Sequence, residues 1–276
     1  MKYREGGVTV AALGAQDVAA GTLQLVAPIP GWMVSLRTAN DRVVCGGAIV
    51  FVTEKTFVIA TAAHCRGRFS YVCVDGATSP SGASGARYYP PANGVWSAEL
   101  HGDWAFIQFS RPKDDRYTLD SLTPDLKVPK EHSRVDMYIW RKTAAHCLLP
   151  DSTPDARLYR LSATVWPSDD WRKADADFIN GGSRSVAGQA YGAGVYPHAP
   201  SIYVPCDGDS GGPVVRGRSL VGTISSQTHT SVAGIALHSD TWASAKNLFL
   251  SDFPAIDLGA LANEDVFSGP VSVQAL

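Results

Sequence analysis

The chain has 276 residues, of which 45% are hydrophobic, and a formal net charge of −2. A chain of this length can bury one large core or two modest ones, because hydrophobic cores stop growing near about 250 to 300 residues. Its lysines and arginines are scattered along the chain and give no basic excess, so nucleic acid is not expected as a partner. No run of about 18 apolar residues is present, so no membrane association is expected.

The first 22 residues contain one apolar run of six residues, Val8 to Leu13, before Gly14. That run is too short for the core of a signal peptide. The pattern favours an intracellular chain or one excised from a longer precursor. The five cysteines form no C-x-x-C pair and no zinc-like spacing, so no metal site is predicted.

Short runs rich in β-branched and aromatic residues recur between turn-forming residues, which is typical of an all-β sandwich or a pair of barrels. In chain order, the predicted strands are 22–28, 32–38, 43–52, 56–62, 69–75, 103–109, 134–140, 157–166, 201–205, 212–215, 219–225 and 232–238.

Three segments depart from this strand pattern. Residues 75–96 are rich in Gly, Ser and Pro and are predicted to be an exposed loop. Residues 241–250 follow a plausible N-cap at Ser239 or Asp240 and space their apolar residues at helical intervals, so they are predicted to form a helix. The last twenty residues have no strong pattern and are predicted to be a flexible tail.

Three motifs carry chemistry. The sequence "CDGDSGGP" at 206–213 places Ser210 in a glycine-rich turn, where a serine nucleophile would need a base and oxyanion donors. The sequence "HGDWAFIQF" places Asp103 at the head of an apolar strand, where a carboxylate needs a partner. The pentapeptide "TAAHC" occurs twice, with His64 in the first copy and His146 in the second.

Together these motifs resemble the chymotrypsin-like serine proteases in composition, order and spacing. The resemblance extends from about Trp32 to Phe249 and is carried by "WMVSL", "CGGAIV", "IATAAHC", "DWAFIQF" and "GDSGGPVV". It implies an all-β fold of two six-stranded antiparallel barrels with a C-terminal helix. The expected divisions are an N-terminal extension (1–22), a first barrel (23–124), a second barrel with the helix (125–256) and the tail (257–276).

The resemblance also implies roles for the motif residues. His64 would be the general base and later the general acid, Asp103 would orient its ring, and Ser210 would be the nucleophile. The backbone N–H groups of Gly208 and Ser210 would form the oxyanion hole. Such chemistry acts on polypeptide substrates and needs no cofactor or metal. The oligomeric state is left open.

The order of the motifs favours His64 over His146 as the base. His64 precedes Asp103 by 39 residues and Ser210 by 146, which leaves room for a barrel. His146 lies only 64 residues before Ser210, and its best available acid would be Asp177. His146 is therefore predicted to be an exposed loop residue.

The chain departs from the family at Asp209. In secreted members the aspartate before the serine pairs with a new N-terminal amino group, and nothing upstream of "WMVSL" resembles that N-terminal segment. Asp209 should therefore have another partner, because a buried unpaired carboxylate is costly.

The cysteines depart as well. Cys45 and Cys65 match a bridge of the family, although the loop between them is longer here, and whether they are bonded is left open. Cys73, Cys147 and Cys206 lack family partners, so at least three thiols are predicted to be free. With the missing signal peptide, this favours an intracellular or viral enzyme of polyprotein processing. A secreted microbial protease is the alternative.

The resemblance places the specificity pocket as well. Val204 stands where trypsin-like members carry an aspartate, so cleavage after Lys or Arg is not expected. The prediction is a shallow apolar pocket for small or medium uncharged residues, with His229 and His238 offering an acidic preference as the minor reading. Its predicted lining is Val204, Pro205, Ile224, Ser225, Gln227 and Gly234.

Two other functions stay open. One is a catalytically silent pseudoprotease that acts as a binding module. The other is an unrelated β-rich esterase or lectin.

Overall fold

We describe the protein from a computed structural model. It describes residues 23–90, 94–96, 105–125, 129–143, 146–147, 156–165, 190–194, 208–227 and 232–235. Across these ranges the chain is nearly all β, and the one helical turn is the 3₁₀ segment η1 (Ala63–Cys65). The same part of the chain contains no helix with the length and apolar character that crossing a membrane requires. The predicted C-terminal helix lies outside the described residues.

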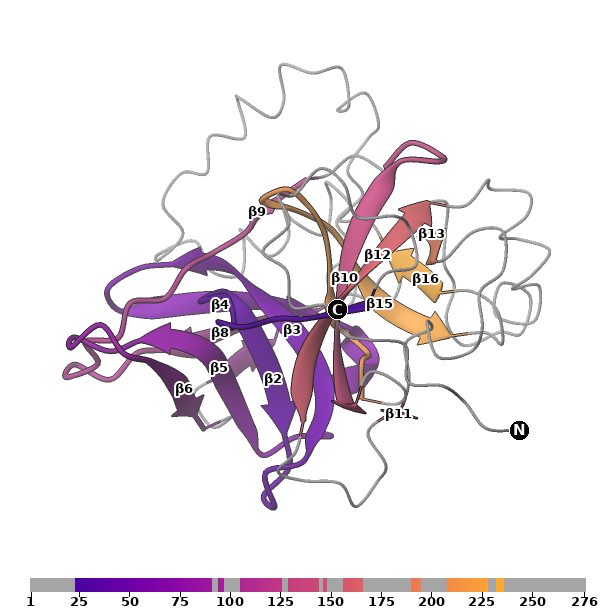
Figure 1. Cartoon of the computed structure of the whole chain (residues 1–276). Helices are drawn as coiled ribbons and strands as arrows, with labels where there is room; N and C mark the ends of the chain where they lie inside the picture. The colour runs from indigo at the N-terminus through magenta and orange to yellow at the C-terminus, as the bar shows by residue number, and fades with distance from the viewer. Residues whose placement is uncertain are drawn as a thin grey trace, which may run out of the picture.

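The strands form two sheets that lie side by side (Figure 1). All strand pairs in the first sheet are antiparallel. In order of pairing, its strands are β6 (Ser84–Tyr89), β5 (Tyr71–Thr78), β2 (Met33–Arg37), β3 (Val43–Val52), β4 (Thr56–Thr61), β8 (Ala105–Ser110) and β7 (Gly94–Trp96).

The second sheet closes on itself, because β10 pairs with β12 as well as with β14. Only the short β9 pairs in parallel, with β15. Its strands are β1 (Leu23–Leu25), β12 (Arg157–Val165), β13 (Ala190–Gly194), β16 (Val232–Ile235), β15 (Ser219–Gln227), β14 (Pro213–Arg216), β10 (Arg134–Thr143), β11 (His146–Cys147) and β9 (Thr123–Pro124).

This architecture confirms the predicted all-β fold of chymotrypsin-like type. The pairing gives seven strands in one sheet and nine in the other among the described residues. Four of them, β1, β7, β9 and β11, have only two or three residues. Without those short strands each sheet has six, as the resemblance implies.

Long apolar runs form the strands at the centre of the first sheet. Every residue of β4 is buried, and β3 is buried at all positions except its second and last. Because both faces of these strands are covered, their sequences read as near-continuous hydrophobic runs rather than as alternations. Sequence reasoning therefore locates both strands well.

Two hydrophobic clusters form the core. The first fills the first sheet and includes Trp140, Leu158, Val215 and Leu220 from the second sheet. The second cluster lies within the second sheet around Met137, Leu161 and Val221. Since the first cluster draws side chains from both sheets, the two sheets pack directly on each other.

The predicted exposed loop at 75–96 is wrong. β5 continues to Thr78, and β6 and β7 fall within that range. A tight turn joins β5 to β6, in which Gly82 has a φ of 83° and donates to the Ser79 carbonyl at 2.9 Å. Glycine and serine are common in such turns, and most residues of β6 are exposed. The loop-like composition therefore did not indicate that β6 is an edge strand.

The two end segments of the range predicted for the first barrel pair with strands of the second sheet. Leu23–Leu25 pairs with β12, and Thr123–Pro124 pairs with β15, so both segments join the second sheet. These segments therefore tie the two sheets together. The division of the chain into domains stays a prediction.

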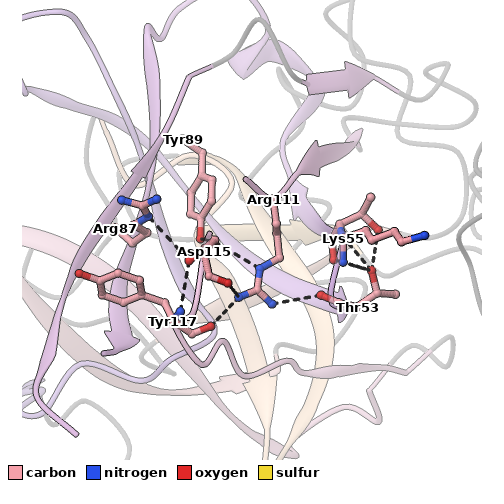
Figure 2. A network of polar contacts seen from close by, with 8 residues as sticks. Thr53, Lys55, Arg87, Tyr89, Arg111, Asp115 and Tyr117 are labelled. Carbon is pink, nitrogen blue, oxygen red and sulfur yellow. Dashed lines mark hydrogen bonds and ion pairs between the residues drawn. The ribbon is translucent and has the colours of Figure 1, made fainter. Parts of the chain in front are cut away.

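A buried polar cluster fixes the segment that follows β8 (Figure 2). The Asp115 carboxylate accepts hydrogen bonds from the Tyr89 hydroxyl at 2.6 Å and from the Tyr117 N–H at 3.2 Å, and it pairs with Arg111 at 3.3 Å. Arg111 also donates to the carbonyls of Thr53 and Tyr117. These contacts hold the segment against the first sheet.

Candidate active site

The nucleophile loop, Gly208 to Gly212, precedes β14. Gly208 and Gly211 have φ values of 97° and 77°, which glycine adopts without steric cost. The Gly212 N–H donates to the Asp209 carbonyl at 2.9 Å, and the Gly211 N–H donates to the Ile224 carbonyl at 2.6 Å. The loop is thus a hydrogen-bonded turn whose shape depends on its glycines.

His64 lies in η1, directly after β4, and is half-buried. The turn is closed by the Cys65 N–H, which donates to the Ala62 carbonyl at 3.1 Å. Cys65 also forms a disulfide with Cys45 of β3. The expected Cys45–Cys65 bridge is therefore present, and it fixes the histidine turn to the centre of the first sheet.

The nucleophile loop lies against this histidine turn. The Gly46 N–H donates to the Ser210 carbonyl at 2.8 Å. The Cys65 Sγ lies 3.7 Å from the same carbonyl, and because this sulfur is in a disulfide it has no proton to donate and makes a packing contact only. Ser210 and the neighbour of His64 are thus in contact, although 145 residues separate them in the chain.

Glycine is required on both sides of this contact. A Cβ at Gly211 would lie 2.2 Å from Thr61 Oγ1 and 2.5 Å from the Gly46 carbonyl oxygen. A Cβ at Gly46 would lie 2.9 Å from the Gly212 Cα. Real Cβ atoms do not approach other atoms this closely, so any side chain here would separate the loop from the histidine turn.

Asp209 has a partner within the second sheet. Its side chain is fully buried, and it forms an ion pair with the buried Arg141 of β10. The Trp140 N–H donates to its Oδ1 at 2.7 Å. The expectation that Asp209 pairs with a group other than a new N-terminus is thus met by Arg141.

Sequence reasoning missed Arg141. It follows the apolar run that ends at Trp140, and its side chain is only 1% exposed. Arg141 lies inside β10 beside the buried Trp140, and a buried arginine needs a partner because an unpaired buried charge is costly. This signal did not identify the partner, since Asp209 lies 68 residues further on.

Arg37 of β2 supports Trp140 from the first sheet. Its guanidinium carbon lies 6.0 Å from the centroid of the Trp140 ring, a cation–π distance. Arg37 also donates to Asp75 at 2.7 Å and to Ser35 at 2.7 Å. A polar cluster of the first sheet therefore contacts the residue whose backbone binds Asp209.

Burial is the main cause of the shifted pKa values of Asp75 and Cys73 in that cluster. Burial raises the pKa of the Asp75 carboxyl, and the Arg37 charge only partly opposes the rise. Burial also raises the pKa of the neighbouring Cys73 thiol well above its usual range, with the Asp75 charge adding to it. Cys73 is free and buried, as expected of a thiol without a family partner, and its raised pKa makes it a poor nucleophile.

Asp103 lies outside the described residues, so its contacts with His64 are not described. The strand it precedes is described. β8 begins at Ala105, which pairs with Thr61 at the end of β4. The start of β8 therefore lies beside the strand that leads into the histidine turn.

His146 is not in a loop, contrary to its predicted role. His146 and Cys147 form the short strand β11, which pairs with the end of β10. The prediction failed because two residues carry too little pattern to show a strand.

The predicted pocket residues are only partly described. Ile224 pairs with Gly234 across β15 and β16, and Ser225 and Gln227 lie further along β15. Ile224 also forms two backbone hydrogen bonds with the nucleophile loop. Its N–H donates to the Gly212 carbonyl at 2.9 Å, and its carbonyl accepts the Gly211 N–H at 2.6 Å. Its side chain is 2% exposed and belongs to the second core cluster. Val204, Pro205, His229 and His238 lie outside the described residues.

One group of metal-ligand types occurs in the described part of the chain. The ligand atoms of Cys45, His64 and Cys65 lie within 4.8 Å of one another. Zinc binds cysteine as the thiolate, and both sulfurs here are in a disulfide. This group is therefore no metal site while the disulfide is formed.

Comparison with known proteins assigns the family. The family model described as Trypsin matches residues 26–242, which include the histidine turn, the nucleophile loop and every described strand except β1. No curated protein matches the chain at a significant level. The family match decides against an unrelated β-rich esterase or lectin. The chain belongs to the trypsin family of chymotrypsin-like serine peptidases.

Proposed function

We propose that the protein is a serine endopeptidase that cleaves polypeptides through an acyl-enzyme on Ser210. His64 takes the proton of the Ser210 hydroxyl and later gives it to the leaving amine, while Asp103 orients the His64 ring. The N–H groups of Gly208 and Ser210 bind the oxyanion of the tetrahedral intermediate.

One observation carries the proposal most directly. The hydrogen bond from the Gly46 N–H to the Ser210 carbonyl holds the nucleophile loop against β3. The Cys45–Cys65 disulfide fixes that turn to the same strand that carries Gly46. A glycine-rich serine turn bonded to the strand that carries the histidine turn supports a nucleophile and a base that act together.

The positive φ values of Gly208 and Gly211 support the oxyanion role. Successive N–H groups converge on one point when the backbone alternates between right-handed and left-handed conformations. Gly208 adopts the left-handed side of φ just before the nucleophile. Donors fixed in this way stabilise developing negative charge without reorganising during the reaction.

The test is substitution at two of the candidate residues, with a third substitution as the control. Ser210→Ala and His64→Ala should each lower turnover by about 10⁴-fold to 10⁶-fold, as loss of a triad member does. His146→Ala is the matched control and should retain nearly full activity, because its strand pairs with β10 rather than with the histidine turn. Equal losses at His64 and His146 would overturn the assignment.

A phosphonofluoridate separates a peptidase from a silent pseudoprotease. It should label Ser210 in the native protein and fail to label Ser210→Ala. A native protein that is neither labelled nor active on a peptide library would instead be a binding module of this fold.

The specificity we propose is for small or medium uncharged residues before the cleaved bond. Its support is Val204, which stands where trypsin-like members carry an aspartate, so no carboxylate is expected to pair with Lys or Arg. Burying one apolar side chain is worth about 1.5 to 3 kcal/mol, which gives about ten- to hundred-fold selectivity. A cleavage profile dominated by Arg or Lys would contradict this pocket, and one dominated by Glu or Gln would point to His229 or His238.

Two biological settings are candidates: intracellular or viral polyprotein processing, and secretion by a microbe. The Cys45–Cys65 disulfide favours the secreted setting, because disulfides persist in oxidising compartments. Titration of the unfolded, non-reduced protein should find three free thiols, from Cys73, Cys147 and Cys206. Finding only the Cys73 thiol would add a second disulfide and strengthen the secreted setting.

A further inference from the structure

Two cysteines and the proposed general base lie together beside the nucleophile loop. The ligand atoms of Cys45, His64 and Cys65 lie within 4.8 Å of one another. In the oxidised protein the two sulfurs form a disulfide, so zinc finds no thiolate there. The reduced protein has two thiols in the same place, and zinc binds cysteine thiolates and histidine nitrogens.

The backbone keeps the two cysteines close without help from the disulfide. Cys45 lies inside β3 and pairs with Leu36 of β2. The Cys65 N–H donates to the Ala62 carbonyl at 3.1 Å, and the Cys65 carbonyl accepts the Arg68 N–H at 3.2 Å. These contacts remain after reduction, so the two Cα atoms, which are 6.3 Å apart, stay near each other.

The spacing of the group suits a zinc ion. Zinc binds sulfur at about 2.3 Å and nitrogen at about 2.0 Å, so the sulfurs of a tetrahedral site lie roughly 3.8 Å apart. That spacing is below the 4.8 Å within which the three ligand atoms already lie. Both cysteines are fully buried, whereas His64 is half-buried and gives the ion access from solvent. Three protein ligands leave the fourth zinc position to water.

We propose that the reduced protein binds zinc through Cys45, Cys65 and His64, and that the bound ion keeps the peptidase silent until the disulfide forms. A neutral imidazole has one nitrogen that accepts a proton, and a zinc ion on that nitrogen prevents it from taking the proton of Ser210. The site itself is independent of the proposed function, whereas its effect on activity rests on that function.

Formation of the disulfide releases the ion. A small disulfide such as oxidised glutathione takes two electrons from the two thiolates and, with two protons, becomes two thiols. The Cys45–Cys65 bond forms in the same exchange, and Zn²⁺ leaves. Thiols persist in reducing compartments and disulfides in oxidising ones. The zinc form therefore belongs to a reducing compartment and the active form to an oxidising one.

The experiment compares oxidised and reduced full-length protein. Because both cysteines are buried, the reduced form is made by unfolding in urea with a phosphine reductant and refolding without oxygen, with or without zinc. Bound zinc is measured by atomic absorption. Co²⁺ replaces zinc as a spectroscopic probe, because thiolate ligands give it a charge-transfer band. A triple variant, Cys73→Ala with Cys147→Ala and Cys206→Ala, leaves only the two proposed thiols.

The reduced triple variant should bind one zinc ion per chain, and the oxidised triple variant should bind none. His64→Ala in the reduced form should weaken zinc affinity by at least about 10-fold, since even loss of a group behind a ligand has that cost. His146→Ala is the matched control and should leave the affinity unchanged, because its strand pairs with β10. Reduced protein that binds no zinc, or a cobalt complex without the thiolate band, would overturn the inference.

Refolding is itself a test. Zinc that binds the folded state stabilises it, so the reduced chain should refold to a higher yield with zinc than without. A reduced chain that does not fold with zinc present would overturn the inference.

Activity tests the effect of the ion on the base. Zinc at about 100 times its dissociation constant fills about 99% of the sites, so hydrolysis by the reduced protein should fall by about 100-fold. A chelator should restore it, and the oxidised protein should keep its activity at the same zinc concentration. Equal inhibition of both forms would overturn the inference, as would reduced protein that is silent without zinc. If the oxidised protein were neither labelled by a phosphonofluoridate nor active, the proposed function would fail, while the zinc and cobalt measurements would still decide the site.

Discussion

Two buried arginine–aspartate pairs have different roles in this molecule. Arg141–Asp209 joins β10 to the nucleophile loop across 68 residues of sequence, whereas Arg111–Asp115 closes a local segment four residues apart. In both pairs the aspartate side chain is fully buried and also accepts a backbone N–H. The chemistry of the contacts is the same, so their locations decide what each pair does.

The comparison teaches where a buried charge acts on function. Asp209 adjoins Ser210, so any change in its position is passed directly to the proposed nucleophile. Asp115 organises the segment that follows β8 in the chain (Figure 2), so its loss should lower the stability of the fold and leave activity unchanged. Buried ion pairs are weak evidence for net stability, but breaking one by removing a partner is strongly destabilising.

Apart from the triad variants, the largest effect is expected from separating the nucleophile loop from β3 and β4, which lead to the histidine turn. Gly211→Ala places a Cβ where Thr61 Oγ1 and the Gly46 carbonyl already lie, and it does so at a φ of 77°. We expect turnover to fall by at least about 10²-fold, since displacement of a catalytic group by about 1 Å has that cost. The measurement is kcat on a peptide substrate.

Gly217→Ala is the control for that change. Gly217 also has a positive φ, 63°, but a Cβ there would meet nothing within 4 Å. It should lower stability by about 1 kcal/mol through backbone strain and leave kcat unchanged. Equal activity losses at both glycines would mean that backbone strain, rather than the contact with the histidine turn, controls the site.

The next effect tests the other half of the comparison. Asp115→Asn leaves the buried Arg111 with a neutral partner, and we expect the free energy of unfolding to drop by about 3 kcal/mol. Turnover should change by less than about twofold, because no contact of Asp115 reaches the nucleophile loop among the interactions described. Urea unfolding measures the loss of stability, and kcat is measured on the same sample. A large fall in kcat would mean that the Arg111–Asp115 pair affects activity as the Arg141–Asp209 pair does.

The contribution of Asp115 should depend on pH in a defined direction. Burial by itself would raise the pKa of this carboxyl, but hydrogen bonds from Tyr89 and the Tyr117 backbone, with the Arg111 charge, lower it below its ordinary value of 3.8. A group whose pKa is lowered by folding stabilises the protein above its unfolded pKa and loses that contribution as the pH falls through the folded pKa.

The stability difference between the native protein and Asp115→Asn should therefore be constant above about pH 5 and should shrink below about pH 4. Urea unfolding of both proteins across that range is the measurement. A difference that grows on acidification would show that the ionised carboxylate does not stabilise the fold.

The sequence predicted the sheets more fully than the contacts between them. β3 and β4 are continuous apolar runs, and such runs show in a linear pattern. β6 was missed because its exposed edge position tolerates glycine and serine. The short β11 was missed because two residues carry no periodicity.

The candidate site shows the same limit. Ser210 and His64 could be proposed as site residues because each lies in a local motif that resembles a motif of the family. Arg141 was missed, because its role exists only after folding brings β10 to Asp209. Sequence reasoning could state that Asp209 needs a partner, but the cost of an unpaired charge does not say which residue supplies the opposite one.

The smallest effect concerns one hydrogen bond of the Asp115 cluster. Tyr89 donates to Asp115 at 2.6 Å, and its ring packs edge-on against Phe57 with the centroids 4.7 Å apart. Tyr89→Phe removes the donor and keeps the ring, so we expect a loss of about 1.5 kcal/mol, the value for a hydrogen bond to a charged group. That loss should be smaller than the loss at Asp115 because Arg111 and the Tyr117 N–H still bind the carboxylate. Urea unfolding of Tyr89→Phe and of the double variant with Asp115→Asn measures it. Nearly the whole Tyr89 effect should vanish in the Asp115→Asn background, and two additive losses would mean that the hydroxyl acts through a different partner.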